Sequence, residues 1–202
     1  AYGMNPEKTI VFPWGVDLEH FRMQNAEGRV AQEGFVLFCN RSWEMRYGVD
    51  VLARAFVKVA QQREDVRLIL LGGGSQGASI RKILQSGGVD EFVTFGGQVS
   101  QTDLPRWYHM ADLYISPSHV DGSSVSLMEA LACLVSDIPA NKEWVFENEN
   151  GWLFRDGDVD HLAEKILAAM NQREKLPQIG GAGRSEAEKR ADWKKNAEVL
   201  MN

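Results

Sequence analysis

The chain lacks several features that mark large classes of protein. It has only two cysteines, Cys39 and Cys133, too few and too far apart for a zinc-binding CxxC pair or a disulfide framework. We expect two buried free thiols, which fits a reducing compartment and favours a cytoplasmic location. No apolar run approaches the ~20 residues that cross a bilayer. We therefore expect no transmembrane segment, although a longer protein could still associate peripherally with a membrane.

Basic residues are also in short supply. The 202 residues include 22 Lys and Arg against 28 Asp and Glu, a formal net charge of −6. Binding to nucleic acid without sequence preference needs clustered positive charge, so we expect no nucleic-acid partner. The sequence contains no internal repeat, no low-complexity segment and no signal peptide. It opens at Ala1 like the middle of a protein, so a targeting segment would have been lost with an upstream region.

The sequence does contain short apolar runs that alternate with amphipathic segments. Residues 35–39 are a continuous apolar run, typical of a parallel strand buried on both faces, and residues 66–71 are predicted to form the next apolar strand. Further strands are predicted within 9–17 and at 93–95, 113–116 and 134–136. Helices are predicted at 49–62, 78–86, 103–110, 123–133, 159–172 and 185–201, with a glycine-containing break at 178–183 before the last. This alternation predicts the α/β class, with a Rossmann-like parallel sheet and helices on both faces.

In such a sheet, ligands bind beyond the carboxyl ends of the strands. Residues 116–130 follow a predicted strand and open a helix there. Residues 122–124 leave backbone N–H groups free at the helix start, where the helix dipole favours a phosphate. Asp121 precedes that start and Glu129 follows eight residues later, and a carboxylate can hold the vicinal hydroxyls of a ribose. An ordinary N-cap, with Glu129 in solvent, would have the same sequence.

The segment at 116–130 resembles the E-x7-E region of the retaining glycosyltransferases of family 4. Other stretches resemble that family in the same order, and the ordered set is more specific than any single motif. They are residues 12–17 with Phe21 (P-x-G-V-D-x-x-x-F), 40–41 with 47–50 (G-R … K-G), 70–74 (V-G-x-G), 93–99 with Leu104 and Tyr108 (V-x-F-x-G-x-V … L-x-x-x-Y), and 148–153 (x-E-N-G-x-L). The resemblance implies one half of a GT-B fold, in which two Rossmann-like domains face each other.

The resemblance also implies a division of the chain. Residues 1–33 would be the interdomain linker and the start of the carboxyl-terminal domain, and residues 34–183 the domain that binds the nucleotide sugar. Residues 184–202, with Trp193, would form a helix that crosses back to a missing amino-terminal domain. That domain would bind the acceptor, a glycan, lipid or small molecule. We therefore expect this fragment alone to bind a UDP- or GDP-type sugar donor with little or no transferase activity.

Roles for charged residues follow from the resemblance, residue by residue. Glu129 would grip the ribose hydroxyls, and Asp121 would face the donor sugar at a position where the family more often has Glu. Arg41 would neutralise the diphosphate. The family's loop lysine is missing, and Arg46 stands near its place, in a loop one residue longer than usual.

Backbone groups are expected to complete the donor site. Gly122 leads into Ser123, Ser124 and Val125, whose N–H groups would hold the diphosphate. Residues Gly97, Gln98 and Val99 would lie beside the base. The implied reaction transfers a sugar with retention at the anomeric carbon. A cationic side chain and a helix N-terminus can stabilise the leaving diphosphate, so we expect no metal ion and no cofactor.

One departure from the family concerns the connection after the Glu129 helix. The helix is predicted to end at Cys133 and the next strand to begin at Leu134, where relatives carry about four more residues of the type Gly-x-Pro-Val. A helix cannot become a parallel strand without a turn. Either residues are absent from the sequence or the connection is shortened.

Other functions remain as alternatives. An NAD-binding Rossmann domain would need a glycine fingerprint after its first strand, and residues 72–74 do not have that spacing. A phosphorylase-like enzyme would need a lysine for its cofactor, and an epimerase of the same architecture is a further rival. A non-catalytic nucleotide-sugar-binding or interaction module is the main alternative, because Asp121 and the missing lysine depart from the family pattern. We interpret the lone His119 as structural.

Overall fold

A computed structural model describes residues 15–21, 34–122 and 132–201 of the chain. Its centre is a six-stranded sheet in which every pairing of neighbouring strands is parallel. The strands are β1 (Phe35–Cys39), β2 (Val66–Leu71), β3 (Val93–Gly97), β4 (Leu113–Ser116), β5 (Cys133–Ser136) and β6 (Trp152–Phe154), in the order β3-β2-β1-β4-β5-β6. The predicted parallel sheet is confirmed, and β6 is a strand that the apolar runs did not indicate.

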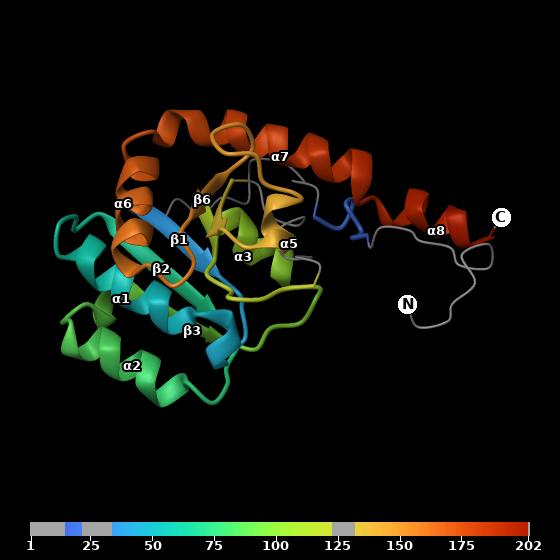
Figure 1. Cartoon of the computed structure of the whole chain (residues 1–202). Coiled ribbons are helices and arrows are strands. Elements are labelled where there is room, and N and C mark those ends of the chain that lie inside the picture. Colours follow the sequence, from blue (N-terminus) through green and yellow to red (C-terminus); the bar gives the residue numbers. More distant parts are fainter. Residues whose placement is uncertain (1–14, 22–33, 123–131, 202) are drawn as a thin grey trace.

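Helices cover both faces of this sheet (Figure 1). They are α1 (Val49–Ala60), α2 (Gly77–Ser86), α3 (Leu104–Met110), α5 (Pro139–Lys142), α6 (Val159–Met170), α7 (Leu176–Arg190) and α8 (Trp193–Met201). Short 3-10 helices lie at η3 (Met45–Tyr47), η4 (Asp90–Phe92) and η5 (Arg173–Lys175). The spacing of Val49, Leu52, Phe56 and Val59 places all four on one face of α1, and all four are buried.

Alternate residues of β1 enter two separate hydrophobic cores. Phe35, Leu37 and Cys39 pack on the face covered by α1, α2 and α6. Val36 and Phe38 pack on the opposite face, with α3 and the end of α7. All five residues of the strand are buried, which confirms the prediction of a strand with two covered faces.

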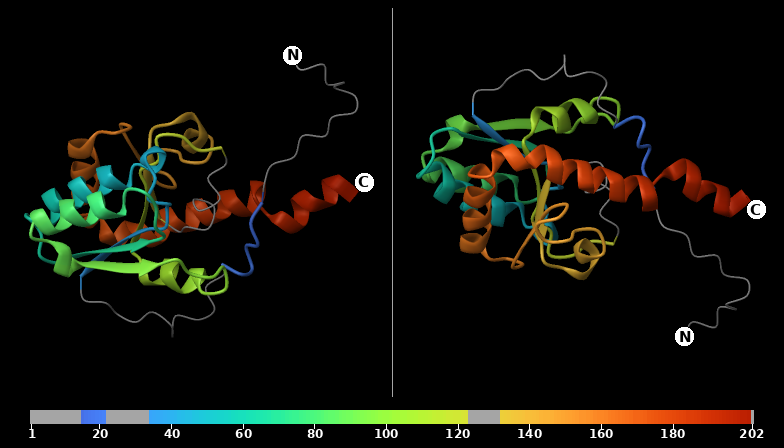
Figure 2. Two further views of the ribbon diagram at one scale, coloured as in Figure 1. Left: turned by 90° about the horizontal axis from the view of Figure 1, so that it is seen from below. Right: turned by 90° about the horizontal axis from the view of Figure 1, so that it is seen from above.

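The predicted helix break at residues 178–183 is wrong. α7 runs through it without interruption, and Gly180 is buried within the helix. Glycine in a helix costs about 1 kcal/mol relative to alanine, a preference that tertiary packing can override. The helix ends instead at Arg190, and the carbonyl oxygen of the following Ala191 accepts a hydrogen bond from the Val16 N–H (2.8 Å). Figure 2 shows α7 running along the domain and α8 continuing beyond it.

The predicted position of Cys133 at the end of a helix is also wrong, because Cys133 is the first residue of β5. The rest of the helix expected at 123–133 lies outside the described residues, apart from Ala132. Both cysteines are buried and free, as expected. Burial raises the pKa of Cys39 to about 11 and that of Cys133 to about 12, so both stay protonated thiols. Among the described helices, none is long and apolar enough to span a membrane.

Candidate functional site

The strand order reverses direction between β1 and β4. From β1 the chain adds β2 and then β3 on one side, and it then adds β4, β5 and β6 on the other. The loops that follow β1 and β4 therefore leave the same edge of the sheet toward opposite sides. Doubly wound sheets bind ligands in the crevice at such a switch point, beyond the carboxyl ends of the strands.

Arg41 and Asp121 meet at this switch point, as the sequence predicted for one site. Arg41 follows β1 and Asp121 follows β4, and Arg41 Nη2 lies 2.6 Å from Asp121 Oδ2. The two side chains are only 11% and 12% exposed. The other carboxylate oxygen accepts a hydrogen bond from the Gly122 N–H (2.9 Å). The Asp121 carboxylate is thus held by a cation and by the backbone at the point where residues 123–131 begin.

Arg41 is a permanent cation with an unused donor. Its Nε is buried and has no hydrogen-bond partner in the described part of the chain. Burial alone would lower the pKa of Arg41, but its interactions with Tyr114 and Asp121 raise it above the usual value. A buried N–H without an acceptor is unusual in proteins and costs about 1–3 kcal/mol. Arg41 is therefore prepared to bind a further anionic or polar group.

Arg46 lies in the same loop, within η3. Its side chain is exposed, and its guanidinium carbon lies 5.0 Å from the centre of the Tyr47 ring. The guanidinium carbon of Arg41 lies 4.7 Å from the centre of the same ring. The structure therefore gathers both predicted cations around Tyr47, with Arg46 on the solvent side.

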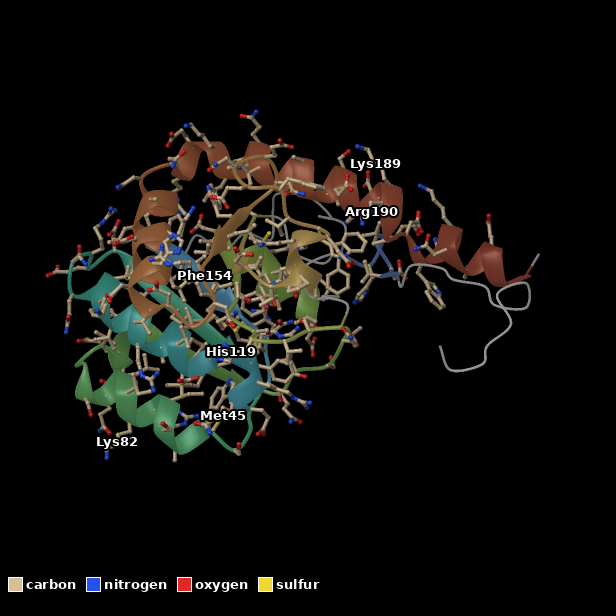
Figure 3. The ribbon with its side chains drawn as sticks, in the orientation of Figure 1. Met45, Lys82, His119, Phe154, Lys189 and Arg190 are labelled. Atoms are coloured by element: carbon tan, nitrogen blue, oxygen red, sulfur yellow. The ribbon has the colours of Figure 1, made fainter. Side chains whose placement is uncertain are left out.

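Close backbone contacts fix the β1 loop to the β4 loop. Gly48 has φ +60°, and a Cβ atom there would lie 2.1 Å from the carbonyl oxygen of Pro117. Only glycine satisfies both conditions. The His119 N–H donates to the carbonyl oxygen of Arg46 (3.0 Å). Figure 3 labels His119 and Met45 in this region, where η3 approaches the β4 loop.

The β1 loop is fixed equally firmly to the loop after β2. The Trp43 N–H donates to the carbonyl oxygen of Gly73 (2.9 Å), and the Gln76 N–H donates to the carbonyl oxygen of Trp43 (2.8 Å). The buried Trp43 indole also donates from Nε1 to the carbonyl oxygen of Leu71 (3.0 Å). Trp43 therefore anchors the loop that carries Arg41.

His119 and Asp156 form a contact that sequence reasoning missed. His119 Nδ1 lies 2.7 Å from Asp156 Oδ1, and the two side chains are 34% and 38% exposed. The pair joins the β4 loop to the segment between β6 and α6. The sequence separates the two residues by 37 positions, and nothing in their local patterns connects them.

A buried network of hydrogen bonds fixes the start of the β4 loop. Ser136 Oγ donates to the carbonyl oxygen of Ser118 (2.5 Å), and Asn141 Nδ2 donates to the carbonyl oxygen of Ser136 (2.8 Å). All three side chains are fully buried. Such a satisfied network rigidifies its surroundings, here the stretch that leads to Asp121.

The residues predicted beside the base lie at the same edge of the sheet, after β3. Gly97 has φ +66°, and its carbonyl oxygen accepts a hydrogen bond from the Gly72 N–H (2.6 Å). Gln98 is exposed and Val99 is half-buried. In the strand order, β2 separates them from Arg41. They share the crevice edge, but they are not part of the tightly bonded loop pair.

Four predicted residues lie outside the described residues, namely Glu129, Ser123, Ser124 and Val125. Their assigned roles stay predictions. Within the described ranges, no group of three or more His, Cys, Asp or Glu side chains could hold a metal ion.

The fold is that of one Rossmann-like half of a GT-B glycosyltransferase. An Anabaena protein solved in complex with UDP and glucose superposes with a TM-score of 0.85 at 20% identity, over 99% of this chain and 58% of that one. The carboxyl-terminal domain of a Francisella tularensis glycosyl transferase group 1 family protein has a TM-score of 0.77 at 17% identity. That match covers 87% of this chain and 97% of the solved domain.

The chain belongs to the family of glycosyl transferases group 1, whose model matches residues 21–199. A GDP-mannose-dependent alpha-(1-6)-phosphatidylinositol monomannoside mannosyltransferase of Mycobacterium tuberculosis is 27% identical over 91% of this chain and 52% of its own length. A phosphatidyl-myo-inositol mannosyltransferase of Mycobacterium leprae is 32% identical over 82% of this chain and 45% of its own length. The chain spans about half the length of these relatives.

Proposed function

We propose that this chain is the donor-binding half of a retaining glycosyltransferase, which transfers a sugar from a nucleoside-diphosphate sugar to a glycan, lipid or small-molecule acceptor. The observation that carries the proposal is the Arg41–Asp121 pair at the switch point. A buried cation with an unused N–H and a fixed carboxylate lie beside each other there. A diphosphate needs a cation such as Arg41, and sugar hydroxyls can bind a carboxylate such as Asp121.

The chemistry follows from the charge that develops during transfer. When the bond between the sugar and the diphosphate breaks, negative charge accumulates on the leaving phosphate. Arg41, held in place by the Asp121 and Tyr47 contacts, would stabilise that charge without reorganising, and Arg46 would add a second cation from the solvent side. Backbone N–H groups after Gly122 would contribute in the same way. We propose that these groups act without a metal ion.

The names of relatives and structural neighbours support a UDP- or GDP-type donor. The Mycobacterium tuberculosis relative is described as GDP-mannose-dependent, and the Anabaena structure contains UDP. We propose a UDP- or GDP-type donor whose base lies beside Gly97, Gln98 and Val99 and whose ribose binds Glu129. Residues 1–33 and 184–202 would contact the rest of a longer protein, which would bring the acceptor.

The alternative is a non-catalytic module of the same fold. Asp121 favours it, because Asp is one methylene shorter than the Glu that the family more often has. Asp121 also already binds Arg41 and the Gly122 N–H. In this alternative the Arg41–Asp121 ion pair only holds the loops after β1 and β4 together, and it binds no sugar.

Calorimetric titration of the chain with UDP, GDP and ADP distinguishes a chain with a nucleotide site from an interaction module without one. We expect one nucleotide to bind with an affinity that a chelator does not change. Arg41→Ala should weaken that binding about tenfold or more, the value of one or two charge-assisted hydrogen bonds. Glu129→Ala should also weaken it if Glu129 holds the ribose.

Arg63→Ala is a matched control for the loss of positive charge. Arg63 is paired with Asp65 before β2, at the opposite edge of the sheet from Arg41. Its substitution by alanine should therefore leave nucleotide affinity unchanged. A folded chain that binds none of the three nucleotides would favour the non-catalytic module. Equal weakening by Arg41→Ala and Arg63→Ala would show a general charge effect and no site at the switch point.

A further inference from the structure

A second hollow lies far from the switch point, where α6 gives way to α7 and β6 begins. Its volume of about 390 Å³ is within the ~300–1,000 Å³ typical of small-molecule sites. Its wall is mostly polar and is formed by Asn148, Glu149, Trp152, Gln172, Lys175, Gln178 and Ile179. In Figure 1 the α6–α7 junction lies on the other side of the domain from the tips of the β1 and β2 arrows. The hollow is therefore separate from the proposed donor site.

Trp152 supplies the observation that points to a ligand. It is the first residue of β6 and only 6% exposed, and it lines the hollow. Its indole N–H makes no hydrogen bond with any described residue, and it is not one of the polar atoms sealed from solvent. A buried indole N–H usually has an acceptor. The indole N–H is therefore open to an acceptor from outside the described residues, and Trp152 borders the hollow.

Glu149 provides an acceptor in the same wall. Within the described ranges, its carboxylate forms no ion pair with Lys175, whose Nζ donates to Gln172 Oε1 (3.1 Å). The neighbouring Asn148 has φ +66° and is the only non-glycine residue with a positive φ among the described residues. Such a conformation is uncommon outside glycine, and Asn is one of the residues that adopt it most readily in turns. The wall thus offers a carboxylate, amides and an indole donor at once.

This set of groups selects one class of ligand. Glu149 and Lys175 both line the hollow, so charge favours neither an anion nor a cation there, and an apolar molecule would leave the indole and amide groups without partners. A ring with several hydroxyl groups can donate two hydrogen bonds to the carboxylate and accept others from the indole and the amides. We propose that this hollow binds a hexopyranose unit of a glycan, at a site separate from the donor site.

A glycan would then bind this domain at a second site. A saccharide bound here would stay near the domain while another part of the same glycan occupies a different site. Linked binding events of this kind raise the effective concentration at the second site without new contacts there.

The indole region of a two-dimensional 1H–15N NMR spectrum tests the proposal on this chain. We expect the Trp152 indole signal, assigned by its loss in Trp152→Phe, to shift saturably with methyl α-mannopyranoside or methyl α-glucopyranoside. Glycerol and sulfate should cause no saturable shift. Glu149→Gln keeps the size of the side chain and should raise the dissociation constant about tenfold, the value of one charge-assisted hydrogen bond.

Glu164→Gln is the matched control, because Glu164 is exposed on α6 and does not line the hollow. It should leave the dissociation constant unchanged, as should Arg41→Ala at the switch point. The proposal is overturned if a folded sample shows no saturable shift with either glycoside. It is also overturned if glycerol or sulfate shifts the Trp152 signal to the same extent, or if Glu149→Gln binds as well as Glu164→Gln.

Discussion

The loops after β1 and β4 and the loop after β3 lie at one edge of the same sheet, but they are built differently. The first two are joined by an ion pair, by the His119 N–H and by the contact of Gly48 with Pro117. The loop after β3 has no ion pair to the other two loops among the described residues; it is held by the backbone hydrogen bond at Gly97, by hydrogen bonds between Ser100 and Asp103 and by His20 Nε2 beside the Gln101 carbonyl oxygen (2.9 Å), and Gln98 is exposed. The part of the edge proposed for diphosphate and sugar is thus organised before a ligand arrives. The part proposed for the base is open.

Substituting alanine for Gly48 in one variant and for Gly97 in another tests this comparison. Both have φ near +60°, so alanine is strained in either place. A Cβ atom at Gly48 would lie 2.1 Å from Pro117 O, whereas at Gly97 nothing lies within 4 Å. The left-handed strain of about 1 kcal/mol should be the whole cost at Gly97. At Gly48 the clash adds to it, for a total of about 3 kcal/mol or more.

Urea unfolding of the two variants measures the difference. We expect Gly48→Ala to lower the free energy of unfolding by at least about 2 kcal/mol more than Gly97→Ala does. Similar losses for both would mean that the β1 and β4 loops can separate at little cost. The comparison between a fixed and an open part of the edge would then be wrong.

The sequence could predict one part of this arrangement and not the other. Continuous apolar runs such as residues 35–39 indicated buried parallel strands, and the loops at the carboxyl ends of such strands indicated where a ligand site should lie. The ion pair between Arg41 and Asp121 was not predicted. The approach of Gly48 to Pro117, and that of His119 to Asp156, depends on how distant loops pack. No local spacing encodes such a contact. The predicted break at residues 178–183 was wrong for the same reason, because packing of Gly180 overrides its weak helix propensity.

Asp121→Asn is expected to have the next largest effect. It leaves the Arg41 charge without its counterion, while the amide oxygen can still accept from the Gly122 N–H. Breaking a buried pair by removing one partner costs about 3–5 kcal/mol. Because these side chains keep some exposure, we expect a smaller loss of about 1–3 kcal/mol in the free energy of unfolding. The freed guanidinium should also bind pyrophosphate more tightly, which calorimetry can measure.

The pair between Arg63 and Asp65 is the control for this substitution. Its atoms are as close, at 2.7 Å, but the side chains are 35% and 53% exposed. Asp65→Asn should therefore change the free energy of unfolding by less than about 1 kcal/mol and should leave pyrophosphate affinity unchanged. If Asp121→Asn is as mild as Asp65→Asn, the switch-point pair is an ordinary surface contact and does not organise the crevice.

The smallest expected effect comes from a comparison of two amide side chains, Asn40 beside Arg41 and Gln98 in the loop after β3. Asn40 Nδ2 donates to the Tyr108 hydroxyl (3.1 Å), and Asn40 Oδ1 accepts from the Tyr114 hydroxyl (3.0 Å). Asn40→Ala removes both hydrogen bonds next to Arg41 and should cost about 1–2 kcal/mol. Gln98 is exposed, so Gln98→Ala should cost less than about 0.5 kcal/mol. Its effect, if it contacts the base, should appear only in the preference among UDP, GDP and ADP. A Gln98→Ala variant that unfolds as readily as Asn40→Ala would show that the loop after β3 is as firmly built as the Arg41 loop, and that the base would meet a fixed surface.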